Sequence, residues 1–208
     1  MKHEKTRALY EYWNKLRGER NAPLRLELDP SAIASLLGNA FVLERLDPQT
    51  YNYRLAGTRI CSFHGKEMRG NSFLEQWNEN DSKTLERLLL ATTNDAAGAV
   101  IGYEARARKD LSVAFEMVLL PLARDSGVYD RIIGIAAPLE TANWVGMMPI
   151  TEMEVKSIRY LWPTDRAIPA DRENAVQPLA GQHAGFSPVS ANDRDPKHIF
   201  QVIKGGRC

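Results

Sequence analysis

The chain has 208 residues, which suits one medium-sized domain with appended segments or two small domains. Hydrophobic residues make up 44% and charged residues 25%, so we expect a sizeable core that needs no disulfide or metal support. The formal net charge of +1 gives no electrostatic reason to expect binding to nucleic acid or to anionic lipid.

The first predicted element is an amphipathic helix over residues 5–18. Leu9, Tyr12, Trp13 and Leu16 recur at i, i+3, i+4 and i+7, which places them on one apolar stripe. A stripe with two large aromatic rings needs a burial partner. Two interpretations stay open here: the helix docks on its own domain, or it forms the contact between two copies of the chain.

A second helix and a hairpin are predicted next. Asp29 supplies an acceptor side chain and Pro30 suits a first helical position, so a helix is expected over residues 30–37. Residues 40–46 and 50–56 then flank an Asp-Pro-Gln turn. The second of these runs alternates apolar and polar side chains, which predicts a β-hairpin.

Residues 57–97 differ from what precedes them, because glycines break the segment into short helical turns. A longer helix is expected over roughly residues 81–95, after the capping run Asn80-Asp81-Ser82. This segment has no strand pattern. We therefore expect it to form a helical cover over a sheet.

Residues 98–140 carry the clearest β pattern. Side chains alternate over 99–107, 111–122 and 128–139, with short turns between, which predicts three long antiparallel strands with one buried face. The opposite parity, with Glu104 and Glu116, is expected to form the outer face. Joined to the hairpin, these strands make a five-stranded antiparallel sheet covered by the helical segment, an α+β fold.

The signals weaken after residue 141. Residues 152–161 are compatible with either a short strand or a helix. Prolines then interrupt a polar stretch, which predicts a tail with little regular structure. The chain is accordingly divided into an N-terminal helix and linker (1–28), a central domain (29–162) and a Pro-rich tail (163–208).

The order of the predicted elements matches that of PAS domains, and several runs make the resemblance more specific. The most specific is Arg54-Leu55-Ala56-Gly57-Thr58-Arg59, and residues 65–70 and 72–77 follow the same pattern. Over residues 6–162 the sequence resembles a family of stand-alone bacterial PAS domains, frequent in alphaproteobacteria and once catalogued as a domain of unknown function. The resemblance implies sensing and signal transduction, without naming a ligand.

A pocket between the sheet and the helical segment is the natural small-molecule hypothesis for such a fold. Core packing explains each apolar residue in that region equally well. The predicted pocket residues are Tyr53, Arg59, Phe63, His64, Phe73, Trp77, Tyr103, Phe115, Met117 and Ile133. The predicted homodimer contact consists of Leu9, Tyr12, Trp13 and Leu16.

The sequence predicts neither a metal site nor a catalytic group, and it identifies no cofactor. The histidines show no ligand spacing with one another or with a cysteine. A haem on His64 is disfavoured, because a lone histidine before a glycine commonly ends a helix. A flavin at Cys61 is disfavoured as well, because its Arg-Ile-Cys-Ser context differs from the Asn-Cys-Arg of flavin-binding PAS relatives.

The location is predicted from three observations. Two cysteines, one internal and one terminal, do not make a disulfide framework, so a reducing compartment is expected. The N-terminal segment lacks the apolar core of a signal peptide. The longest apolar runs are too short to span a membrane. We therefore expect a cytoplasmic protein.

These features predict a sensory or regulatory protein that signals through a protein partner, with neither nucleic acid nor membrane as a partner. One alternative is a small α+β enzyme whose acid or base is Glu67, His64 or Asp81. The buried parities of 99–107 and 111–122 hold no pair of titratable groups, which argues against that enzyme. The other alternative is an adaptor that binds no ligand.

Overall fold

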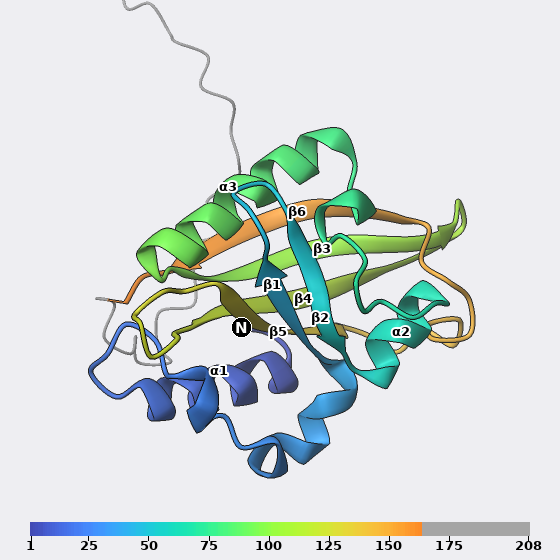
Figure 1. Cartoon of the computed structure of the whole chain (residues 1–208). Coiled ribbons are helices and arrows are strands. Elements are labelled where there is room, and N and C mark those ends of the chain that lie inside the picture. Colours follow the sequence, from blue (N-terminus) through green and yellow to red (C-terminus); the bar gives the residue numbers. More distant parts are fainter. Residues whose placement is uncertain (164–208) are drawn as a thin grey trace, which may run out of the picture. The chain divides into compact units, whose positions relative to one another are not determined.

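The computed structural model describes residues 1–163, and Figure 1 shows their arrangement. The helices are α1 (Glu4–Arg17), the 3-10 helices η1 (Arg25–Glu27) and η2 (Pro30–Asn39), α2 (Thr58–His64), the 3-10 helix η3 (Leu74–Gln76) and α3 (Glu79–Asp95). The strands are β1 (Ala40–Arg45), β2 (Tyr51–Ala56), β3 (Gly98–Arg108), β4 (Leu111–Leu122), β5 (Arg131–Pro138) and β6 (Glu152–Leu161). No helix within residues 1–163 is long and apolar enough to cross a membrane.

The predicted antiparallel sheet with a helical cover is confirmed, with one strand more than expected. The order is β2-β1-β5-β4-β3-β6, and every neighbouring pair is antiparallel. The additional strand is β6, which the sequence left as strand or helix. Its side chains are mostly half-buried or exposed, and its register with β3 shifts between Gly102 and Tyr103. An edge strand with such a bulge lacks clean alternation.

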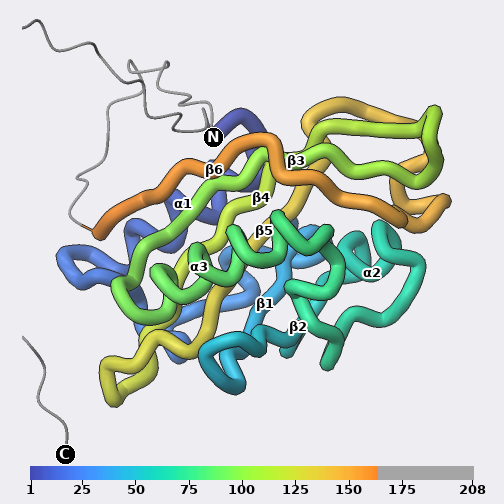
Figure 2. Tube along the Cα trace, turned by 90° about the horizontal axis from the view of Figure 1, so that it is seen from above, coloured from blue at the N-terminus to red at the C-terminus, as the bar shows by residue number. Residues whose placement is uncertain are grey.

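Helices cover both faces of the sheet, as Figures 1 and 2 show. One face packs against α2, η3 and α3 through a core that mixes aromatic with aliphatic side chains. The other packs against α1 and η2 through a mainly aliphatic core. We call the first the helix-covered face, after the helical cover predicted for residues 57–97, and the second the α1 face. Because β5 lies in the middle of the sheet, nearly all its side chains are buried on one face or the other.

The N-terminal helix docks on its own sheet. His3 Nδ1 accepts a hydrogen bond from the Lys5 N–H at 3.0 Å, which caps the first turn of α1. Leu9 and Trp13 are 0% and 4% exposed within the α1-face core. The Trp13 indole Nε1–H donates to the Pro121 carbonyl oxygen at 2.7 Å. Leu9 and Trp13 of the apolar stripe therefore find their burial partner inside the same chain.

Glu116, which the alternation placed on an outer face, is buried under the start of α1. Its carboxylate accepts hydrogen bonds from the backbone N–H groups of Lys2, at 2.7 Å, and His3, at 2.9 Å, and from the Thr6 hydroxyl. Burial raises the pKa of Glu116, but these bonds outweigh burial and hold the pKa below its ordinary value. The carboxylate thus fastens the first turn of α1 to β4.

Gly57 lies in the middle of the run of residues 54–59, and the structure explains why this position is a glycine. Its N–H donates to the Ala40 carbonyl oxygen at 2.8 Å, which places the start of α2 directly against the end of η2. A Cβ at this position would lie 2.0 Å from the Leu37 carbonyl oxygen and 2.5 Å from that of Gly38. These contacts are with backbone atoms, so only glycine fits here.

Candidate functional site

Most of the predicted pocket residues lie together on the helix-covered face, where their side chains fill the core. They are Tyr53, Phe63, Phe73, Trp77, Tyr103, Phe115 and Met117. Neighbouring rings touch at centroid distances such as 5.2 Å for Trp77–Tyr103, 5.2 Å for Tyr103–Phe115 and 5.9 Å for Tyr53–Phe73. Burial raises the pKa of Tyr53 and Tyr103, which keeps both hydroxyls protonated.

The remaining predicted pocket residues lie elsewhere. Ile133 belongs to the α1 face, because β5 is buried on both sides and its alternation cannot indicate which face a residue joins. Arg59 is exposed on α2. His64 is partly buried at the end of α2, where burial and, to a lesser extent, the charge of Lys66 lower its pKa to about 4.

The predicted dimer residues divide in the same way. Leu9 and Trp13 are buried within the chain, so these two residues dock α1 on its own domain rather than on a second copy. The Tyr12 hydroxyl accepts from the Asp29 N–H at 2.8 Å, and Leu16 is half-buried. A contact between two copies through Tyr12 and Leu16 stays a prediction.

A pocket of about 440 Å³ lies at the edge of the helix-covered face, between η3 and the paired strands β3 and β6. We call it the Trp77 pocket. Its lining residues are Glu75, Gln76, Trp77, Asn78, Glu104, Arg106, Thr151, Glu152, Met153 and Glu154. Of the residues predicted from sequence, Trp77 reaches it. Because β6 supplies one wall, the sequence pattern could not indicate this pocket.

Two buried polar atoms in residues of this lining lack a hydrogen-bond partner within residues 1–163. They are the indole Nε1 of Trp77 and the side-chain Oε1 of Gln76. Trp77 is 6% exposed, and the Gln76 Nε2–H₂ donates to the Ser72 carbonyl oxygen at 3.1 Å. An unsatisfied buried donor or acceptor costs about 1–3 kcal/mol. A bound group that accepts from the indole and donates to the amide would remove that cost.

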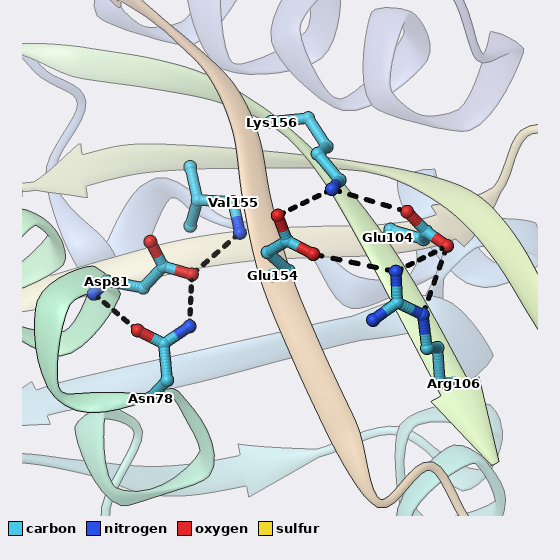
Figure 3. A network of polar contacts seen from close by, with 7 residues as sticks. All are labelled: Asn78, Asp81, Glu104, Arg106, Glu154, Val155 and Lys156. Atoms are coloured by element: carbon cyan, nitrogen blue, oxygen red, sulfur yellow. Dashed lines mark hydrogen bonds and ion pairs between the residues drawn. The ribbon is translucent and has the colours of Figure 1, made fainter. Parts of the chain in front are cut away.

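Figure 3 shows a network of charged side chains of alternating sign, of which Glu104, Arg106 and Glu154 line the Trp77 pocket. Arg106 contacts Glu104 at 3.0 Å and Glu154 at 3.6 Å. Lys156 contacts Glu154 at 2.6 Å and Glu104 at 3.4 Å. Hydrogen bonds from Ser112 and Arg106 lower the pKa of Glu104. This network joins β3 to β6 and places charged groups of both signs beside the pocket.

Asp81 ties α3 to β6, as Figure 3 shows. Its Oδ2 accepts from the Val155 N–H at 2.8 Å and from the Asn78 Nδ2–H₂ at 2.7 Å. Asn78 in turn caps α3 by accepting from the Asp81 N–H at 3.0 Å. Asp81 was one acid of the alternative enzyme, and here it fastens the wall of the Trp77 pocket.

The other candidates for catalysis or metal binding have local roles. The Glu67 carboxylate accepts from the Arg69 N–H at 3.0 Å and from the Cys61 thiol at 3.7 Å. His64 lies at the end of α2, before Gly65. Within the described part of the chain, no group of three or more His, Cys, Asp and Glu side chains is placed to hold a metal ion.

The family model described as a PAS domain matches residues 1–137 of this chain. No curated protein matches the sequence.

Similar solved structures share low sequence identity with this chain. The light-state LOV structure of the blue-light photoreceptor Aureochrome1 is 12% identical, with 57% of this chain and 93% of that chain covered and a TM-score of 0.39. A light-oxygen-voltage domain studied with a flavin analogue is 15% identical, with 56% and 87% covered and a TM-score of 0.41. The PAS domain of an HTR-like protein from Haloarcula marismortui is 21% identical, with 55% and 94% covered and a TM-score of 0.34.

Proposed function

The chain belongs to the PAS domain family, and from that premise we propose that it is a regulatory module that binds a small polar molecule and signals through a protein partner. The resemblance predicted from the sequence is confirmed at the level of the family. PAS domains as a class serve sensory signalling rather than catalysis. The ligand, the partner and the dimer belong to the proposal.

The observation that supports ligand binding is a pair of unpartnered polar atoms that belong to two residues lining the Trp77 pocket. Trp77 Nε1–H needs an acceptor, and Gln76 Oε1 needs a donor. A hydroxyl or an amide group supplies both. Arg106 and Glu154 at the rim offer further contacts to polar groups of the same molecule. A volume of about 440 Å³ suits a small metabolite rather than a single ion.

Native mass spectrometry of the freshly purified full chain tests this proposal. We expect a bound small molecule that is retained by the wild type and lost from Trp77→Phe, because phenylalanine keeps an apolar ring and removes the N–H. Trp13→Phe on the α1 face is the matched control and should retain the molecule.

Two outcomes would contradict the proposed ligand. One is a wild type with the bare polypeptide mass that no compound in a screen of polar metabolites stabilises against heat, and this outcome would favour the adaptor. The other is equal retention by the wild type and Trp77→Phe.

The proposed partner contacts include a homodimer. Tyr12 and Leu16 are the residues of the predicted stripe that keep exposed surface on α1. Leu16→Gln should therefore convert a dimer into a monomer, as measured by light scattering. A monomeric wild type would rule the dimer out.

The location and the domain limits rest on the sequence. We propose a cytoplasmic location, and the limits 1–28, 29–162 and 163–208 stay predictions. Residues 164–208 lie outside the described residues. The predicted tail and three of the residues weighed as metal ligands or disulfide partners, His183, His198 and Cys208, fall in that part.

A further inference from the structure

A second pocket, of about 390 Å³, lies where the linker after α1 meets the turn between β4 and β5. It is lined by Arg25, Leu26, Ala123, Arg124, Asp125, Ser126 and Arg131 and shares none of these residues with the Trp77 pocket. Backbone hydrogen bonds join the two segments that form this pocket. The Arg25 N–H donates to the Ala123 carbonyl oxygen at 2.9 Å, and the Ala123 N–H donates to that of Pro23 at 2.9 Å.

Arg131 is the buried cation of this pocket. It is 7% exposed, and its terminal nitrogens pair with Glu44 and with Asp130. Its Nε–H lies buried without an acceptor among residues 1–163. A buried guanidinium N–H without an acceptor is costly, because a donor on a charged group loses more solvation than a neutral one. One arginine that lines the pocket therefore has a charged donor that no group within residues 1–163 satisfies.

Arg25 is the free cation of the pocket. Its exposed guanidinium makes no hydrogen bond or ion pair within residues 1–163. Arg124 pairs with Asp130. Among the lining side chains, Asp125 alone is acidic, against Arg25, Arg124 and Arg131. Glu44 and Asp130 offset the charges of Arg131 and Arg124, so Arg25 is the lining arginine whose charge no ion pair within residues 1–163 offsets.

We propose that this pocket binds an oxyanion group, a phosphate or a carboxylate carried by a small molecule. Arginine suits such a group, because its planar guanidinium presents several N–H donors at the spacing of phosphate and carboxylate oxygens. Arg25 contributes a complete guanidinium, Arg131 its Nε–H and Ser126 a hydroxyl. The bound anion would join the linker to the β4–β5 turn and hold both in place.

Calorimetric titration of the full chain tests the proposal with three probes: inorganic phosphate, pyrophosphate and succinate, each at constant pH and ionic strength, with chloride as the reference anion. We expect saturable binding of at least one probe. Stronger binding of phosphate and pyrophosphate identifies a phosphoryl ligand, and stronger binding of succinate identifies a carboxylate ligand.

The decisive variant is Arg25→Gln, because Arg25 is exposed and its replacement leaves the core intact. We expect the affinity to fall at least tenfold. Arg87→Gln is the matched control, since Arg87 is exposed on α3 and makes no ion pair within residues 1–163. It removes the same charge away from the pocket and should leave the affinity unchanged. Trp77→Phe should also leave it unchanged, which separates this site from the proposed ligand of the Trp77 pocket.

A second variant addresses the buried donor. Arg131→Lys keeps a positive charge beside Glu44 and Asp130 but removes the Nε–H, so its affinity should fall while a cooperative thermal melt is retained. In the wild type, the anion should slow amide hydrogen exchange at Arg25 and Ala123. The proposal is overturned if no probe binds saturably, if Arg25→Gln binds as tightly as the wild type, or if Arg87→Gln weakens binding equally.

Discussion

The two faces of the sheet each bury a tryptophan, but they treat its indole N–H differently. On the α1 face, Trp13 Nε1–H donates to the Pro121 carbonyl oxygen at 2.7 Å. On the helix-covered face, Trp77 Nε1–H has no acceptor within the described residues. The two rings are almost equally buried, at 4% and 6% exposed. Burial alone therefore does not explain the difference.

The polar groups around each tryptophan follow the same division. On the α1 face, Glu116 binds the start of α1, and Asn39 donates to the Ala136 carbonyl oxygen at 3.0 Å while accepting from Lys5 Nζ at 2.8 Å. These bonds fasten one element to another. Beside Trp77, the Gln76 oxygen is unpartnered as well. The polar groups around Trp13 thus attach α1 and η2 to the sheet, whereas Trp77 and Gln76 each keep a buried polar atom without a partner among the described residues.

The largest expected effect concerns the core itself. Trp77→Ala should lower the free energy of unfolding by about 3–5 kcal/mol, because it removes a ring packed between Phe73 and Tyr103. Met147→Ala, at a residue 77% exposed, should change it by less than about 0.5 kcal/mol. Urea denaturation measures both. If the two changes cost the same, Trp77 is not part of the core.

The second effect tests how Glu116 attaches the start of α1 to β4. Glu116→Gln should cost about 1.5–3 kcal/mol at pH 7, because charge-assisted bonds to Lys2, His3 and Thr6 are weakened. Since the folded pKa is lowered, the carboxylate stabilises the fold fully above its ordinary pKa of 4.5, and this stabilisation disappears as the pH falls through the folded pKa.

The control for that experiment is Glu19→Gln, a change of the same kind at an exposed residue. Urea denaturation between pH 7 and pH 3 should show a smaller loss of stability at acid pH for Glu116→Gln than for the wild type or the control. Parallel curves for all three proteins would show that Glu116 does not fasten α1.

The third effect compares the tryptophans directly. Trp13→Phe and Trp77→Phe remove the same atoms from equally buried rings, but only the first breaks a hydrogen bond. Trp13→Phe should therefore cost about 1 kcal/mol more than Trp77→Phe. Denaturation of the ligand-free protein provides the measurement. Equal costs would mean that the Trp77 indole has an acceptor in solution, and the contrast between the faces would fail.

The smallest effect concerns the surface of the helix-covered face. Lys83 and Glu79 pair across one turn of α3 at 2.6 Å, with side chains 63% and 83% exposed. Lys83→Gln should cost about 0.3–0.5 kcal/mol, and less in high salt. A loss above about 1 kcal/mol would contradict the interpretation of this contact as a solvated surface ion pair.

The sequence predicted the elements whose pattern is local. The alternation over 99–107 and 111–122 corresponds to β3 and β4 almost residue for residue, because the odd-numbered side chains are buried along nearly the whole length of each strand. The resemblance centred on Gly57 also has a local origin, since the close approach of η2 excludes a side chain there. Such constraints are visible in a single stretch of sequence.

The sequence could not predict features that depend on distant partners. Ile133 was placed on the wrong face because β5 is buried on both sides. Glu116 alternates like an exposed residue, and only α1, more than a hundred positions earlier, covers it. The unpartnered state of Trp77 Nε1 depends on every group within hydrogen-bonding distance, and periodicity contains no such information.

The docking of α1 also affects the order in which the protein folds. Its bonds to β4 span 114 residues between Lys2 and Glu116 and 108 between Trp13 and Pro121. Contacts so far apart in sequence carry a large loop-closure entropy, whereas the β3–β4 hairpin closes locally. During synthesis α1 emerges before the strands that bury it, and its binding surface is complete only after residue 121 has been made. Until then the stripe around Leu9 and Trp13 is exposed, so α1 is a site at which the nascent chain is vulnerable to misassociation.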